Sequence, residues 1–409
     1  MRAFAYGMLG VLLAVSLTQR GLSPVAIGAL ITVSLVGDFF GTYLIGLYAD
    51  RWGRRRTLVA LAGLMALTGA IFGLLSFYPI LLIAGFFGTL GTSGSETAPF
   101  LPIEQAIVPQ IVRSERRTAT FARYNLVASF AGAMGALAAG LPDVLTHTGI
   151  SLSSGIRLMF GLYVLAAFVA AVLAMRLSPS VEADSRPQAT NGAQHRRWPP
   201  RFTPALHRSR SIVMRLAALF SVDALAGGLI VQSLVALYFH LRFGVPLGTL
   251  GVLFFAANSL SALSFLVAVP LARRFGLLNT MVFTHLPSNL LLAVVAFMPT
   301  FPLAAAVLLL RQLLSQMDVP TRQAYTMALV APEERTAAAS VTSLARSAGS
   351  AASPVISGAL LQGMLLTLGL PFVIAGAMKS IYDLTLWRTF RQVRVIEEQP
   401  RGDPAAQRR

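Results

Sequence analysis

The 409 residues are 55% hydrophobic and 12% charged, whereas charged residues make up about a quarter of a soluble globular protein. The composition therefore excludes that class and indicates a polytopic membrane protein. The net charge of +17 arises from 33 basic residues, all but one of them arginine. Basic loops mark the cytoplasmic side of a membrane, so we attribute the excess charge to orientation and expect no nucleic-acid partner. Cysteine is absent, which excludes disulfides and thiolate metal sites.

Twelve apolar segments follow one another along the chain, and each is close to the length of about 20 residues that spans a bilayer as a helix. We expect spans at residues 2–19, 26–47, 57–77, 80–103, 118–141, 157–176, 212–240, 247–270, 278–298, 303–326, 337–362 and 368–388. The sequence therefore predicts an all-α polytopic membrane protein with twelve transmembrane helices.

A polar stretch divides these segments into two sets of six. Residues 177–210 are rich in Pro, Arg, Ser, Gln and Asn, which predicts a flexible cytoplasmic linker. The expected domains are an N-terminal six-helix bundle at 1–176, the linker at 177–210, a C-terminal six-helix bundle at 211–388 and a cytoplasmic tail at 389–409. Only Arg2 precedes the first apolar run as a charge, so we expect no cleavable signal peptide. We also expect a few further residues upstream of Met1.

A short basic turn separates the second and third expected spans. From Gly46 to Leu58 it reads GLYADRWGRRRTL. It resembles the signature of the loop between the second and third helices of the major facilitator superfamily, G-x-L-A-D-R-x-G-R-R/K-R/K, with Tyr48 in place of Leu. A simple positive-inside anchor would need neither Asp50 nor the glycines. The resemblance implies two pseudo-symmetric six-helix bundles and a transport function.

The two halves of the chain also repeat each other. At an offset of 223 positions, Gly53 falls on Gly276, within a copy of the basic turn that has lost its acid. At an offset of 218 positions, Glu104 falls on Arg322. Parallel repeats of this kind are described for the superfamily, so the internal repeat supports the same fold.

The superfamily resemblance also implies a latch at the cytoplasmic side. Asp50 would cap the helix that begins near Thr336, through the helix dipole, with Arg113 or Arg117 as its ionic partner. Glu104 and Arg322 occupy equivalent positions with opposite charges, and we expect them to pair when the cytoplasmic side is closed. The expected latch and gate residues are Asp50, Arg51, Gly53, Arg54, Glu104, Arg113, Arg117 and Arg322.

Charges inside spans are costly and by default face a bundle interior or a water-filled cavity. In the tenth span Arg311, Asp318 and Arg322 share one helical face. Two interpretations remain open: the cluster locks this span to a neighbour, or a carboxylate or anionic substrate competes for the arginines. In the twelfth span we expect Lys379 and Asp383, four residues apart, to neutralise each other.

Carboxylates supply candidate proton sites. Asp38 in the second span and Asp223 in the seventh could each accept a coupling proton or pair permanently with an arginine. Glu96 lies in a glycine- and proline-rich part of the fourth span, where it is a candidate proton or cation site or an interfacial glutamate. The expected substrate-binding or proton-binding residues are Asp38, Glu96, Asp223, Gln232, Arg311 and Asp318.

The favoured function is secondary active transport of a small solute by alternating access, as a monomer in a bacterial inner membrane with both termini cytoplasmic. Resemblance to drug exporters favours proton-coupled efflux. Uptake of an organic anion or other nutrient, with a proton or other coupling ion, is one alternative. A non-transporting scaffold, sensor or lipid flippase is another. No nucleotide-binding or metal-ligand motif is present, and no histidine pair is expected inside the membrane, so we expect no enzyme activity, cofactor or metal.

Overall fold

The computed structural model describes residues 1–91, 99–100, 103–104, 107, 114–178, 181–182, 209–330 and 334–392. Within these ranges the regular secondary structure is helical. Eight helices of the described part are long and apolar enough to cross a membrane, judged by length and composition. The predicted all-α polytopic fold is confirmed.

Helices of the first bundle follow the expected spans closely. They are α1 (Arg2–Gln19), α2 (Pro24–Trp52), α3 (Arg54–Leu74), α4 (Tyr78–Phe87), α6 (Ser114–Ala138), α7 (Leu141–Thr146) and α8 (Leu152–Met175). The fourth expected span agrees in its first half, where α4 ends at Phe87. Much of its second half, including Glu96, lies outside the described residues.

Helices of the second bundle differ in that three expected spans are interrupted. The elements are α9 (Arg210–Leu229), α10 (Gln232–Phe243), α11 (Leu247–Phe275), α12 (Leu277–Val295), α13 (Phe301–Ser315), α14 (Asp318–Ala328), α15 (Arg335–Ala352), α16 (Pro354–Leu360), α17 (Gly363–Leu368) and α18 (Leu370–Phe390). The breaks fall at Ile230, Gln316 and Ser353. Pro354 explains the last break, because proline cannot donate the backbone hydrogen bond that continues a helix.

Two glycines turn the chain at the equivalent loops of the repeat. Gly53 lies between α2 and α3 with φ of 94°, and Gly276 lies between α11 and α12 with φ of 81°. Glycine adopts positive φ without the steric cost that other residues meet. The conformations of Gly53 and Gly276 support the alignment of the two halves that the sequence predicted. We call the end of the molecule that holds these two glycines and Met1 the basic-turn end.

The two bundles pack closely at the other end of the molecule. There α2 contacts α16, and α1 contacts α10. A Cβ added to Gly28 in α2 would lie 2.4 Å from the carbonyl oxygen of Pro354. The backbone N–H of Val355 donates a hydrogen bond of 3.1 Å to Oγ1 of Thr32. Small residues permit such close backbone approach between membrane helices.

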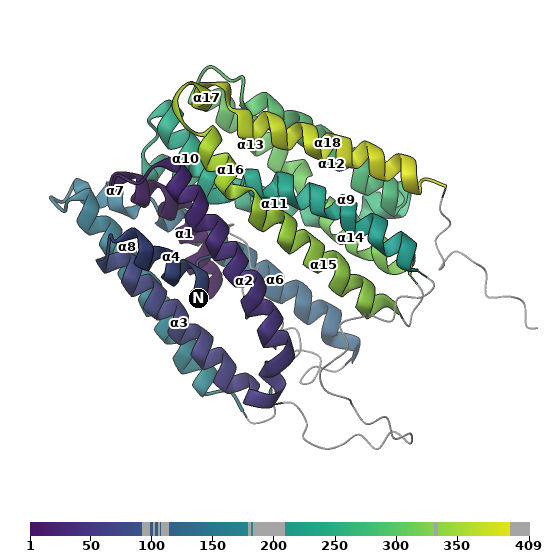
Figure 1. Cartoon of the computed structure of the whole chain (residues 1–409), viewed down its shortest axis with the longest axis horizontal. Coiled ribbons are helices and arrows are strands. Elements are labelled where there is room, and N and C mark those ends of the chain that lie inside the picture. Colours follow the sequence, from purple (N-terminus) through teal and green to yellow (C-terminus); the bar gives the residue numbers. More distant parts are fainter. Residues whose placement is uncertain are drawn as a thin grey trace, which may run out of the picture.

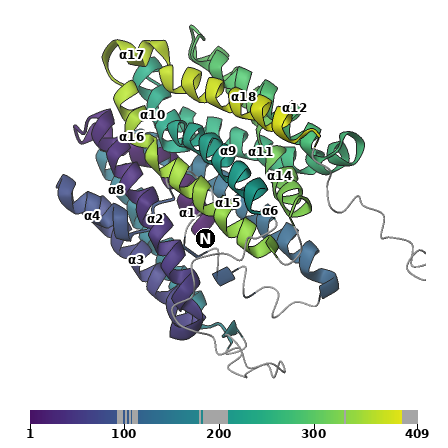
Figure 2. The same cartoon turned by 45° about the vertical axis from the view of Figure 1, so that its right-hand side comes forward.

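A second contact between the bundles lies at the same end, where α6 and α7 meet α11. Oδ2 of Asp143 accepts a hydrogen bond of 2.5 Å from the backbone N–H of Gly248, and Gly248 in turn lies against Gly140. We call this end of the molecule the closed end. From it α2 and α15 diverge towards the basic-turn end, as both views show (Figures 1 and 2).

Candidate functional site

Asp223 in α9 is the centre of a buried ion-pair network in the second bundle. Its Oδ1 lies 2.6 Å from Nζ of Lys379 in α18. Its Oδ2 lies 3.0 Å from Nη1 of Arg346 in α15 and 3.5 Å from Nη1 of Arg322 in α14. Asp223 is 2% exposed, so three cations from three helices surround one carboxylate that water hardly reaches. Of the two alternatives for Asp223, proton uptake and permanent pairing with an arginine, this structure shows it paired with two arginines and a lysine.

The predicted cluster of the tenth span is divided by the helix break. Nη1 of Arg322 lies 2.7 Å from Oδ2 of Asp318, both in α14. Arg311 belongs to α13 and is buried; its Nη1 donates a hydrogen bond of 3.0 Å to Oε1 of Gln312. Arg311 is within electrostatic range of Asp318 and Asp223. Arg311 thus has a neutral hydrogen-bond partner within α13, whereas Arg322 has a carboxylate partner within α14.

The expected pairing of Lys379 with Asp383 is wrong. Lys379 pairs with Asp223 instead, and Asp383 faces α12, where its Oδ1 lies 3.1 Å from Nδ1 of His285. Nδ2 of Asn289 donates a hydrogen bond of 2.8 Å to Oδ2 of Asp383. Side chains four residues apart on a helix can interact, but here each faces a different neighbouring helix. Sequence analysis missed His285 as well, because no local pattern joins it to a carboxylate 98 positions away.

Asp38 is the buried carboxylate of the first bundle. It is 8% exposed, and its Oδ1 has no hydrogen-bond partner within the described residues. The hydroxyl oxygens of Tyr6 and Thr89 are also buried. Tyr6 and Tyr163 are both within electrostatic range of Asp38. Among the described residues, no ion pair to Asp38 is present. An unpaired buried charge is costly, which distinguishes Asp38 from Asp223.

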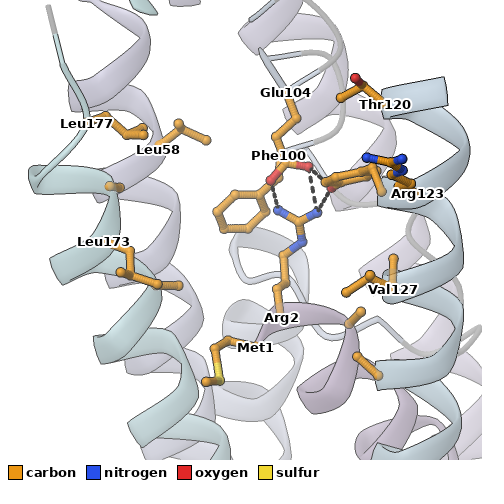
Figure 3. A pocket seen from close by; sticks show the side chains of 16 residues that line it. Met1, Arg2, Leu58, Phe100, Glu104, Thr120, Arg123, Val127, Leu173 and Leu177 are labelled. Atoms are coloured by element: carbon orange, nitrogen blue, oxygen red, sulfur yellow. Dashed lines mark hydrogen bonds and ion pairs between the residues drawn. The ribbon is translucent and has the colours of Figure 1, made fainter. Parts of the chain in front are cut away.

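Glu104 and Arg322, the expected gate, lie apart in this structure. Glu104 accepts two hydrogen bonds from Arg2, of 2.6 and 2.8 Å, and one from the hydroxyl of Tyr124 (Figure 3). The guanidinium of Arg2 also lies 4.6 Å from the ring centre of Phe100. These groups line a cavity of about 620 Å³ between α3, α6 and α8. The gate was expected when the basic-turn end is closed, so its pairing stays a prediction for that state.

The basic turn is held within the first bundle. Oδ1 of Asp50 lies 2.7 Å from Nε of Arg54. The backbone N–H groups of Arg54 and Arg55 donate hydrogen bonds to the carboxylate of Glu182, of 2.6 and 3.2 Å. A carboxylate at the start of α3 is favourable because it meets the positive end of the helix dipole. Sequence analysis did not identify Glu182.

The remaining latch residues do not form the expected latch among the described residues. The N-cap of α15 is Glu334. The carboxylate of Asp50 pairs with Arg54, and no hydrogen bond between Asp50 and the described start of α15 is present. Arg113 and the side chain of Arg117 lie outside the described residues, and Arg51 is exposed.

Gln232 begins α10, and its Nε2 is buried without a partner in the described part of the chain. No group of three or more His, Cys, Asp or Glu residues that could hold a metal occurs among the described residues.

Comparison with known proteins assigns the family. The model of the Major Facilitator Superfamily matches residues 1–354. The chain belongs to this superfamily. An uncharacterized membrane protein of Saccharomyces cerevisiae is 27% identical over 408 residues, which cover 94% of this chain and 91% of the yeast protein.

Solved structures of the superfamily fold superpose well on the chain. The nucleoside transporter NupG matches with a TM-score of 0.70 and 13% identity, covering 95% of this chain and 99% of NupG. The inward-open xylose transporter XylE from E. coli matches with a TM-score of 0.69 and 14% identity, covering 97% and 96%. At this identity the likeness shows the fold, and the multi-pass membrane architecture follows from it.

Proposed function

We propose that this protein is a secondary active transporter that moves a small solute across a membrane by alternating access. The observation that carries the proposal is the asymmetry between the two ends. Helices of the two bundles are in contact at the closed end, where the hydrogen bond from Val355 to Thr32 joins them, and α2 and α15 diverge from there. A transporter that exposes its site to one side at a time has this arrangement in one of its two states.

The orientation that we propose places the basic-turn end in the cytoplasm, since basic loops are retained there. Under that orientation both termini are cytoplasmic, and the arrangement corresponds to an inward-facing state. The proposed domains are residues 1–176 and 211–388, with a linker at 177–210 and a tail at 389–409. We further propose that Glu104 and Arg322 pair in the outward-facing state, when Asp50 approaches the start of α15.

Asp38 is the proposed proton site. Its carboxylate is buried and forms no ion pair among the described residues, whereas Asp223 pairs with three cations. Taking up a proton removes the uncompensated charge at low cost to the surrounding packing. Because α2 contacts α16 and α15 of the other bundle, a change of charge on α2 is placed to influence the contact between the bundles.

For direction, the resemblance to drug exporters supports proton-coupled efflux, and we retain it as the first proposal. Uptake with protons is the second candidate, and the cations around Asp223 favour it for an organic anion. In either direction a proton-coupled transporter links solute movement to proton movement, by exchange in efflux and by co-transport in uptake.

Reconstitution in proteoliposomes tests the transport proposal. Vesicles containing the full chain are loaded with unlabelled compounds from a panel, and counterflow of the labelled compound is followed with and without a pH gradient. We expect counterflow for at least one compound and acceleration by the gradient. Folded protein that exchanges no compound of a broad panel would instead favour a scaffold or sensor.

A further inference from the structure

The buried network of the second bundle contains more positive than negative charge. Four cations, Arg311, Arg322, Arg346 and Lys379, accompany two carboxylates, Asp223 and Asp318.

The third buried carboxylate nearby does not remove this excess. Asp383 is bonded to His285 and Asn289. Counting Asp383, the described cluster keeps an excess positive charge of one when His285 is neutral and two when it is protonated. Buried charges without a counter-charge are strongly unfavourable, so the excess indicates that an anion joins the cluster.

Arg311 is the cation of the cluster whose positive charge is least compensated by the described residues. The residue is 9% exposed, its Nε is buried without a partner among the described residues, and its Nη1 bonds only to the neutral oxygen of Gln312. Guanidinium offers five donors that match planar carboxylate and phosphate oxygens. Here most of that capacity is unused by the described side chains.

Arg346 is the most exposed cation of the cluster. Its side chain is 33% exposed, whereas those of Arg322 and Lys379 are each 9% exposed. It belongs to α15, which packs against α9 and also contacts α2 of the first bundle. Of these three cations, Arg346 is therefore the one that an approaching anion meets first.

We propose that this cluster binds the substrate, and that the substrate is a small organic anion carrying two negative charges on carboxylate or phosphate oxygens. The proposal rests on the transport function proposed above and names its substrate class. Arg346 receives the anion, and Arg311 supplies the deeper unsatisfied donors. Asp223 and Asp318 keep Arg322 and Lys379 in place.

Thermal unfolding of the purified full chain tests the binding site. Succinate and glycerol 3-phosphate are the first two probes, followed by a panel of other dicarboxylates and phosphate esters. Succinamide and glycerol are the neutral controls, with sodium chloride added to equal ionic strength. We expect at least one dianion to raise the melting temperature of the wild type and the neutral compounds to leave it unchanged. A response to dicarboxylates alone, or to phosphate esters alone, identifies the source of the charge.

Two variants separate an anion site from a structural ion-pair network. Arg311→Gln removes the unsatisfied cation, and Arg388→Gln removes the same charge from an exposed position of α18. Without added anion, we expect Arg311→Gln to unfold at the same temperature as the wild type or higher, because an uncompensated buried charge is gone. We expect the anion response to be lost in Arg311→Gln and retained in Arg388→Gln. A lower melting temperature of Arg311→Gln, with no anion response in the wild type, would show a structural network and overturn the proposal.

Transport distinguishes this inference from the function on which it rests. In proteoliposomes we expect anion counterflow whose half-saturating concentration rises at least about tenfold in Arg311→Gln, the scale of one charged hydrogen bond. Counterflow of neutral solutes only, equal in the wild type and Arg311→Gln, would refute the anion site and leave the transporter intact. Loss of all counterflow despite anion-dependent stabilisation would count against transport itself.

Discussion

Lys379 and Asp223 form the shortest ion pair of the buried network, with 2.6 Å between Nζ and Oδ1. The pair joins α18 to α9, and its two residues are 156 positions apart in sequence. Asp223 also holds Arg346 and Arg322, so the two partners are not equivalent. Losing the lysine leaves the carboxylate with two cations, whereas losing the carboxylate leaves three cations without their shared partner.

Because Lys379 and Asp223 are not equivalent, we predict an order of stability among variants that lack one or both of them. We expect Asp223→Asn to lower the free energy of unfolding by about 3–5 kcal/mol, as is usual when a buried charge loses its partner. Lys379→Met should cost less, and the double variant should be more stable than Asp223→Asn alone, because it carries one uncompensated cation fewer. Thermal unfolding in detergent measures the order. Equal losses in the two single variants would mean that the arginines do not share the carboxylate.

Asp38 gives a prediction about coupling. Asp38→Asn keeps the size of the side chain but cannot change charge, so a proton gradient should no longer drive net flux while solute counterflow continues. Asp38→Glu restores a titratable group and is the matched control; we expect it to retain some gradient-driven flux. Proton movement is followed with a pH-sensitive dye inside the vesicles. Full gradient-driven flux in Asp38→Asn would assign the proton to another group.

We predict that a substitution at Gly28 opens the closed end. A Cβ at this position would lie 2.4 Å from the carbonyl oxygen of Pro354, so Gly28→Ala should force α2 and α16 apart. Gly63→Ala is the control, since nothing lies within 4 Å of a Cβ added there. The chain has no cysteine, which allows a single cysteine at Thr32 to report access from the closed end. We expect faster labelling at Thr32→Cys with Gly28→Ala than with Gly63→Ala.

Glu104 forms its ion pair with Arg2 in this structure and is proposed to pair with Arg322 in the outward-facing state. If it pairs with Arg322 during transport, the double reversal Glu104→Arg with Arg322→Glu should recover counterflow lost in each single reversal. The competing pair is tested by Arg2→Glu with Glu104→Arg, which preserves the bond seen here. Recovery by the second pair alone would assign Glu104 a structural role and remove it from the gate.

Much of the fold could be predicted because its determinants are local in sequence. Apolar length located the spans, and the glycines of the repeated turn fixed equivalent positions, which the positive φ of Gly53 and Gly276 supports. None of the helix breaks at Ile230, Gln316 and Ser353 was predicted, and only the one at Ser353 is followed directly by a proline.

The candidate site was harder to predict because its pairs join distant helices. The sequence identified Asp223, Arg311, Asp318 and Arg322 as candidate functional charges inside the spans. Spacing along one helix, however, suggested the wrong partner for Lys379. The pair of His285 with Asp383 and that of Glu104 with Arg2 depend on how helices are rotated against each other. Such rotation is set by packing over the whole bundle, which no single span encodes.

The central claim, alternating access between two ends, is tested most directly by distances in reconstituted protein. Spin labels at exposed Trp52 and Ala339 report the basic-turn end, and labels at exposed Ser76 and Thr367 report the closed end. Pulsed electron paramagnetic resonance in liposomes, at two pH values and with or without a transported solute, gives both distance distributions. We predict that the first distance shortens in the same conditions in which the second lengthens. Distances that stay fixed at both ends under conditions of active counterflow, or that change at one end only, would contradict the account.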